Sequence, residues 1–189
     1  MSMPTSFKME KPLNKTELRS IKPSRHEFTK LSRNPIYIAL DSLKCAHNIG
    51  TILRLSDALL VNRVYICGNT IVPPNRKIKA SSRGSERWVS WEYRENIVDL
   101  IKELKNNGTF IISSEISHSS VDYNEAEYHF PVCLVLGREY DGICEDVLNL
   151  SDCIVHLPVY GMTNSINVST TASVLLYDIL KRLRSKSHG

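Results

Sequence analysis

Short apolar runs alternate with amphipathic stretches over most of this chain. The apolar runs have the length of β-strands, and small polar turns bound them. Strands that alternate with helices are typical of an α/β fold, in which helices cover both faces of a parallel sheet. The predicted strands are residues 36–40, 63–67, 109–113, 132–136 and 153–157, with a further short strand at 88–91.

Helical spacing of apolar residues is clearest in two stretches. Asn96 provides a polar N-cap for a helix at 97–106, and Gly108 ends that helix. A second helix follows Asn167 and has cations in its last turn, where they suit the helix dipole. Its apolar face is formed by Val168, Ala172, Leu175, Leu176, Ile179 and Leu183.

The remaining elements are predicted from weaker patterns. Asn48 is the expected N-cap of a helix at 49–60, and Arg54 lies off the apolar face of that helix. Short helices are expected at 143–148 and, capped by Thr16, at 16–21. The stretches 68–87 and 114–130 are polar and are expected to be irregular loops.

Charge is distributed unevenly along the 189 residues, which carry a net charge of +4. Residues 1–34 contain eight Lys or Arg against three Glu, and prolines interrupt them. We therefore expect three parts: a basic extension at 1–34, flexible or partly helical, one domain at 35–184 and a short tail at 185–189.

A second group of cations lies in the polar stretch after the second predicted strand. A basic arm together with a basic loop favours a polyanion as the partner, although a solvated surface would show the same composition. We expect contacts with such a polyanion from Arg76, Lys77, Lys79, Arg83 and Arg87, with Trp88 and Trp91 directly after them.

Several function classes lose support. The five Cys form no C-x-x-C pair and the six His show no ligand spacing, so we expect reduced thiols and no metal site. No apolar run is long enough to span a membrane, and the N-terminus lacks the apolar stretch of a signal peptide, so a cytoplasmic location without a membrane partner is expected. Neither a G-x-G-x-x-G nor a P-loop motif occurs.

Three stretches place a small polar turn directly after an apolar strand, and parallel strands bring such turns to one edge of a sheet. They are His47-Asn48-Ile49-Gly50 with Arg54, the segment LVLGREYDG at 134–142, and LPVYGMTNSINVS at 157–169. In order and spacing they resemble the N-x-G-x-x-x-R, LVLGxExxG and IPMxGxxxSLNVS signatures of the TrmH (SpoU) branch of the SPOUT RNA methyltransferases. Ile166 stands where that family usually has Leu, and Tyr140-Asp141 replaces small residues.

The resemblance implies a fold, a cofactor and a reaction. The fold is a parallel sheet flanked by helices on both faces, with a deep C-terminal trefoil knot, in a homodimer. The reaction is methyl transfer from S-adenosylmethionine, without a metal, to a ribose 2′-OH of RNA. The family pattern assigns cofactor binding to Gly137, Leu157 and Ile166, and catalysis to Arg54, Asn48, Glu139, Ser165 and Asn167.

Two alternatives remain at this point: an RNA-binding module of the same fold without catalysis, and a methyltransferase that acts on a base nitrogen. Asn48, Ser165 and Asn167 would equally suit helix capping. We favour tRNA over rRNA, because the 34 residues before Pro35 are too few for the separate RNA-binding domain that some rRNA enzymes of this family carry.

Overall fold

The computed structural model describes residues 11–138 and 141–186. The chain divides into two compact units, Met1–Ser32 and Arg33–Gly189. Within the described residues, no helix is long and apolar enough to cross a membrane.

The first unit contains two short helices, α1 (Lys15–Ser20) and α2 (Arg25–Lys30), each started by a capping box. In α1 the Asn14 side chain accepts hydrogen bonds from the backbone of the first turn, and Glu17 accepts one from the Asn14 backbone N–H. The short helix expected here is therefore present, but Asn14 caps it and not Thr16. No residue of α1 is buried, so these local bonds are its main support.

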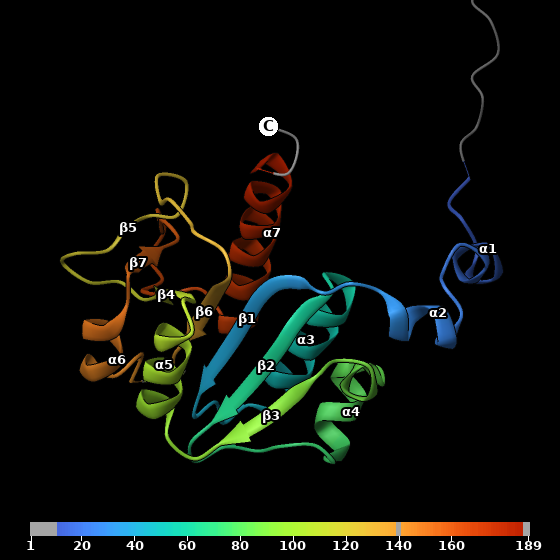
Figure 1. The fold of residues 1–189 in the computed structure, drawn as a ribbon, viewed down its shortest axis with the longest axis horizontal. Helices are drawn as coiled ribbons and strands as arrows, with labels where there is room; N and C mark the ends of the chain where they lie inside the picture. Colours follow the sequence, from blue (N-terminus) through green and yellow to red (C-terminus); the bar gives the residue numbers. More distant parts are fainter. Residues whose placement is uncertain (1–10, 139–140, 187–189) are drawn as a thin grey trace, which may run out of the picture. The chain divides into compact units, whose positions relative to one another are not determined.

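The second unit is built on a parallel sheet, as the alternation of elements predicted (Figure 1). Over the described residues it has seven strands in the order β3-β2-β1-β6-β4-β7-β5. Every pair of neighbouring strands is parallel. The strands are β1 (Asn34–Asp41), β2 (Val61–Cys67), β3 (Trp91–Arg94), β4 (Phe110–Ser114), β5 (Val121–Asp122), β6 (Val132–Leu136) and β7 (Cys153–His156).

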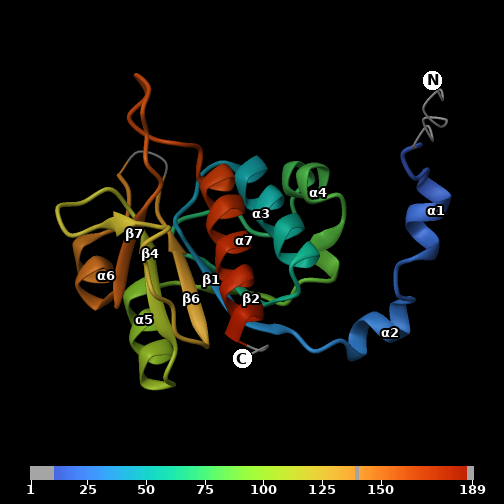
Figure 2. The same cartoon turned by 90° about the horizontal axis from the view of Figure 1, so that it is seen from above.

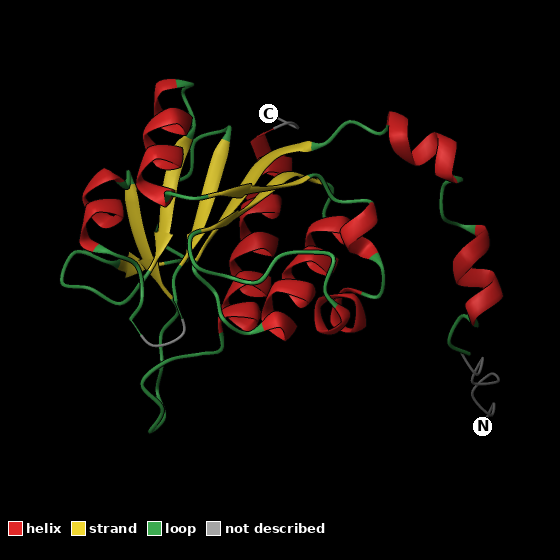
Figure 3. Ribbon diagram, turned by 90° about the horizontal axis from the view of Figure 1, so that it is seen from below, coloured by secondary structure: helices red, strands yellow, loops and turns green. Residues whose placement is uncertain are grey.

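Helices flank the sheet and enclose an apolar core on each face (Figure 3). One core is formed with α3 (Ala46–Ala58) and α7 (Val168–Lys186), which lie side by side (Figure 2). The other is formed with α5 (Ile97–Asn106) and α6 (Glu145–Leu150). The fully buried strand β6 lies between both cores, as a continuous apolar run predicts.

The predicted bounds of β6 and α5 are confirmed, and Asn96 caps α5 as expected. The expected loop at 68–87 is wrong, because it contains α4 (Arg76–Ser82) and a 3-10 turn, η1 (Ser85–Arg87). The strand expected at 88–91 begins only at Trp91. The stretch 114–130 also includes the two-residue strand β5, which pairs with β7.

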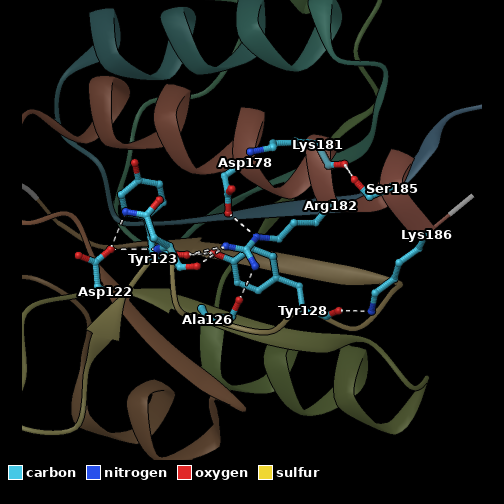
Figure 4. Close-up of polar contacts among 10 residues, drawn as sticks. Asp122, Tyr123, Ala126, Tyr128, Asp178, Lys181, Arg182, Ser185 and Lys186 are labelled. Carbon is cyan, nitrogen blue, oxygen red and sulfur yellow. Dashed lines mark hydrogen bonds and ion pairs between the residues drawn. The ribbon is translucent and has the colours of Figure 1, made fainter. Parts of the chain in front are cut away.

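Two side chains of α7 hold the segment 123–128 to the helix, and Arg182 makes most of the contacts while Lys186 donates to the Tyr128 carbonyl oxygen at 2.8 Å (Figure 4). Arg182 donates to the carbonyl oxygens of Ala126 at 2.7 Å, Tyr123 at 3.0 Å and Asn124 at 2.9 Å. It also pairs with Asp178 at 2.7 Å, and its guanidinium carbon lies 4.8 Å from the centre of the Tyr128 ring. The sequence placed Arg182 among the cations that suit the helix dipole, and the structure adds a second role, because Arg182 also satisfies backbone groups of another segment.

Candidate functional site

A cavity of about 430 Å³ opens where β4, β6 and β7 end. Its position follows from the register, because Ser114 pairs with Leu136 on one side and with Val155 on the other. The residues just after these strands therefore lie side by side. The volume is within the range of small-molecule sites in proteins. The wall is formed by residues 114–116, 136–138, 156–157 and 165–168, with Gly142, Val159 and Thr171.

All three residues predicted to bind a cofactor line this cavity: Gly137, Leu157 and Ile166. Gly137 begins a tight turn in which Arg138 and Gly142 exchange two backbone hydrogen bonds of 3.2 Å. A Cβ atom on Gly137 would lie 2.6 Å from the Gly142 carbonyl carbon, which is closer than real side chains come. Only glycine therefore lets this turn fold back on itself.

Two of the predicted polar residues meet next to the cavity. Asn167, which lines it, donates from Nδ2 to Asn48 Oδ1 at 3.2 Å. Asn167 Oδ1 also accepts from the backbone N–H and the hydroxyl of Ser169, at 2.9 and 2.7 Å, and so caps the start of α7. Capping and a position in the site thus coexist in this residue. Ser165 lines the same cavity.

The prediction that Asn48 caps its helix is wrong. The first turn of α3 starts earlier, at Ala46, with Cys45 at the N-cap position and no side-chain capping bond. Asn48 therefore lies within the helix and is only 4% exposed. Its side chain makes a tertiary contact, because it accepts a hydrogen bond from Asn167, 119 residues further along the chain.

Arg54 lies on the exposed side of α3, as its place off the apolar face predicted. It does not contribute to the described wall of the cavity. Glu139, the remaining residue assigned to catalysis, lies outside the described residues. The structure thus brings together six of the predicted cofactor and catalytic residues: Gly137, Leu157, Ile166, Asn48, Ser165 and Asn167.

The predicted RNA-binding cations lie on and directly after α4, and all are exposed: Arg76, Lys77, Lys79, Arg83 and Arg87. Helix α4 packs against α3 at Gly50, the glycine of the first signature. A Cβ on Gly50 would lie 2.0 Å from Ser81 Oγ and 2.5 Å from the Ile78 carbonyl oxygen. Gly50 therefore allows the basic helix to approach α3.

Sequence reasoning missed Glu115, which lines the cavity directly after β4. One carboxylate oxygen accepts the backbone N–H of Ile143 at 2.9 Å, and the other accepts that of Ile116 at 3.0 Å. The signal was present, because Glu115 is the first charged residue after an apolar strand. We had assigned it to an irregular loop.

Arg138 was also missed. It lines the cavity, and its guanidinium lies 3.6 Å from Asp41 and 3.8 Å from Asp141. Asp41, at the end of β1, is only 2% exposed, so Arg138 compensates a buried carboxylate beside the site. In the part of the chain that the structure describes, no group of three or more His, Cys, Asp or Glu could hold a metal ion.

The profile of the SpoU rRNA Methylase family matches residues 35–177, which includes every element around the cavity. This chain belongs to that family. The resemblance seen in the three signatures is therefore confirmed, as is the parallel α/β sheet.

Curated relatives of this SpoU-family chain include tRNA (guanosine(18)-2'-O)-methyltransferases. The one from Escherichia coli K12 is 30% identical over 143 residues, which are 75% of this chain and 61% of that protein. The one from Aquifex aeolicus VF5 is 30% identical over 171 residues, 89% of this chain and 79% of the relative. The chain thus spans less than two thirds of the length of its E. coli relative.

Solved structures agree with the family assignment. The A. aeolicus TrmH/SpoU tRNA modifying enzyme has a TM-score of 0.74 and 28% identity, over 86% of this chain and 85% of that one. An AdoMet-bound rRNA methyltransferase from Sinorhizobium meliloti has a TM-score of 0.75 at 23% identity, over 82% of this chain and 60% of that one. The second likeness is one of fold.

Proposed function

We propose that this SpoU-family protein transfers a methyl group from S-adenosylmethionine to a ribose 2′-OH of RNA, with tRNA as the favoured substrate. One observation carries the proposal: a single cavity is lined by Gly137, Leu157 and Ile166 and adjoins the Asn48–Asn167 pair. The relatives in E. coli and A. aeolicus, both named as tRNA 2'-O-methyltransferases, support the reaction and the substrate class.

The residues of the cavity fit this cofactor. Leu157 and Ile166 offer apolar walls for an adenine, and Gly137 lets a ligand approach the main chain closely. The charged and polar groups Glu115, Arg138 and Ser165 suit the ribose and the amino-acid part. When bound, S-adenosylmethionine supplies an electrophilic methyl group on a sulfonium. We propose that none of this requires a metal.

The protein must then hold a ribose in line with that methyl group and help a weakly acidic hydroxyl to lose its proton. Asn48 and Asn167 fix each other, so they can orient the ribose with little loss of side-chain freedom. Arg54 keeps its positive charge, so it is not a base. We assign it to gripping an RNA phosphate and lowering the pKa of the 2′-OH, with a phosphate oxygen taking the proton. Glu139 stays a predicted site residue.

Four further features belong to the proposal: the deep C-terminal trefoil knot, a homodimer packed beside the cavity, a cytoplasmic location, and a division of the chain into a basic extension at 1–34, which contacts RNA, and a domain at 35–184. The TM-score of 0.74 to the A. aeolicus enzyme supports the knot. All five cysteines are free thiols, which supports a reducing compartment. The exposed cations on α4 support the contact with RNA.

The proposal is tested by incubating the purified protein with unmodified tRNA and methyl-labelled S-adenosylmethionine, followed by nuclease mapping. Label in a nuclease-resistant dinucleotide is expected, because a 2′-O-methyl group blocks cleavage of the next phosphodiester. Label on a base would identify a base methyltransferase. RNA binding without transfer would identify a binding module. Calorimetric titration with the cofactor in the presence of a chelator tests whether binding needs a metal. Loss of cofactor binding under this condition would reject a metal-free site.

A further inference from the structure

Glu115 lines the cavity, and its carboxylate has more acceptor positions than its hydrogen bonds to the backbone use. It follows β4 directly, and its backbone N–H donates to the Val155 carbonyl oxygen of β7 at 3.0 Å. The side chain reaches across to β6 and its turn, where Oε2 accepts the N–H of Ile143 at 2.9 Å. Among the residues that the structure describes, Oε1 accepts the N–H of Ile116 alone, at 3.0 Å. Glu115 is thus held in place by the main chain while it lines the cavity.

Space for this carboxylate is built into the turn. A Cβ atom on Gly142 would lie 2.3 Å from Glu115 Oε2, so a side chain there would push the carboxylate away. Gly142 also has a φ of +67°, a conformation that glycine adopts without strain. The glycine in the turn after β6 and the carboxylate after β4 therefore fit each other.

The remaining capacity of this carboxylate indicates what it recognises. An ionised carboxylate offers about four acceptor positions, and the two backbone bonds leave about two of them, one on each oxygen. A vicinal diol presents two O–H donors at matching spacing, as in carboxylates that bind the ribose of dinucleotides. Resting on the proposed function, we infer that Glu115 recognises the 2′,3′-diol of the adenosyl ribose and selects ribonucleoside ligands in this cavity.

The test measures binding and not turnover. S-adenosylhomocysteine and its 2′,3′-dideoxy analogue share the adenine and the amino-acid part, so they differ only in the diol. Calorimetric titration of the full-length wild-type protein should show about a tenfold to hundredfold preference for S-adenosylhomocysteine, as expected for hydrogen bonds to a charged group. Glu115→Gln keeps one acceptor for the Ile143 N–H but has an amide in place of the second oxygen. It should bind both ligands with equal, weakened affinity.

The matched control is Glu127→Gln, which changes an exposed carboxylate on the same segment and should keep the full preference. Equal weakening of both ligands in Glu115→Gln, at an unchanged preference, would reduce Glu115 to a support of the turn and overturn the inference. Equal affinity of the wild-type protein for S-adenosylhomocysteine and its 2′,3′-dideoxy analogue would also overturn the inference. This outcome does not depend on whether Glu115→Gln folds. Failure of the wild type to bind either ligand would instead reject the cofactor proposed above.

Discussion

Asn167 Nδ2 donates a hydrogen bond to Asn48 Oδ1 at 3.2 Å, although 119 residues separate them. The bond joins the first turn of α3 to the start of α7, and both residues belong to signatures that were recognised separately in the sequence. The site is therefore also a fastening between two helices.

This fastening predicts coupling between the two asparagines. In urea unfolding, Asn48→Ala and Asn167→Ala should each destabilise the protein, the second by about 1 kcal/mol more because it also removes the cap of α7. The double variant should lose less than the sum, by about 0.5–1.5 kcal/mol. Asn96→Ala removes a cap from α5 without touching Asn48 and should combine additively with Asn48→Ala. Additive losses for Asn48 and Asn167 would show that their bond contributes nothing.

Arg54→Ala should abolish most methyl transfer and leave fold and cofactor binding nearly intact. Arg54 is exposed, so its truncation opens no cavity in the core. Removal of an electrostatic donor to the transition state typically costs a hundredfold to a thousandfold in rate. Arg54→Lys keeps the charge but lacks the planar fork that can hold two oxygens. A near-normal single-turnover rate for Arg54→Lys would reject the bidentate role. A near-normal rate for Arg54→Ala would reject any catalytic role of Arg54.

The basic arm and the cations of α4 should supply affinity for RNA and not chemistry. Deletion of residues 1–30, or Lys77→Ala with Lys79→Ala, should weaken tRNA binding while calorimetry shows unchanged cofactor binding. Each lost phosphate contact should reduce the slope of log K against log salt by about 0.7–0.9. Lys102→Ala removes an exposed cation from α5 and should leave that slope unchanged. An unaltered salt slope of tRNA binding after deletion of residues 1–30 would show that the arm makes no contact with RNA phosphates.

Gly50→Ala should displace α4. The new Cβ would lie 2.5 Å from the Ile78 carbonyl oxygen, and a backbone atom cannot rotate away as a side chain can. Thermal unfolding should show a loss of about 1–3 kcal/mol, as for overpacking in a core, and RNA affinity should fall with it. Gly161→Ala is the matched control for stability, since nothing lies within 4 Å of its Cβ position. Equal stability of the two variants would contradict the packing argument.

Arg182→Ala should loosen the segment 123–128 from α7. The change leaves three backbone carbonyls and Asp178 without the guanidinium that they share, so we expect a loss of about 2–4 kcal/mol in urea unfolding. Hydrogen exchange should rise first in this segment. Lys181→Ala, next to it but exposed, should cost little. Unchanged exchange at 123–128 in Arg182→Ala would show that other contacts hold the segment.

Local patterns predicted the elements that are stabilised locally. The apolar run of β6 and the Asn96 cap of α5 contain their own signal, so their bounds were predictable. Helix α4 was missed because only Ile78 and Ser82 are buried in it, and that is too few for a helical period. Asn75 caps α4 locally, but its close packing on α3 depends on Gly50, which no pattern within α4 reveals.

The same distinction holds for the site. The turns after β6 and β7 were expected to meet because parallel strands end at one edge, and Gly137, Leu157 and Ile166 do line one cavity. Glu115 was missed because the N–H that it binds, on Ile143, lies 28 residues further along the chain. Asn48 was misjudged for a related reason, since its partner is distant and a local cap was the nearest explanation.

The strand order also determines which strands can pair during co-translational folding. Strands β1 and β4 are synthesised early, yet neither pairs with the other, because β6 lies between them. Until Val132–Leu136 has left the ribosome, both strands carry an unpaired apolar edge, the kind of edge that recruits other chains. Strand β6 therefore joins β1 to β4 only late in synthesis, and the other edge of β4 stays open until β7 (Cys153–His156) has followed.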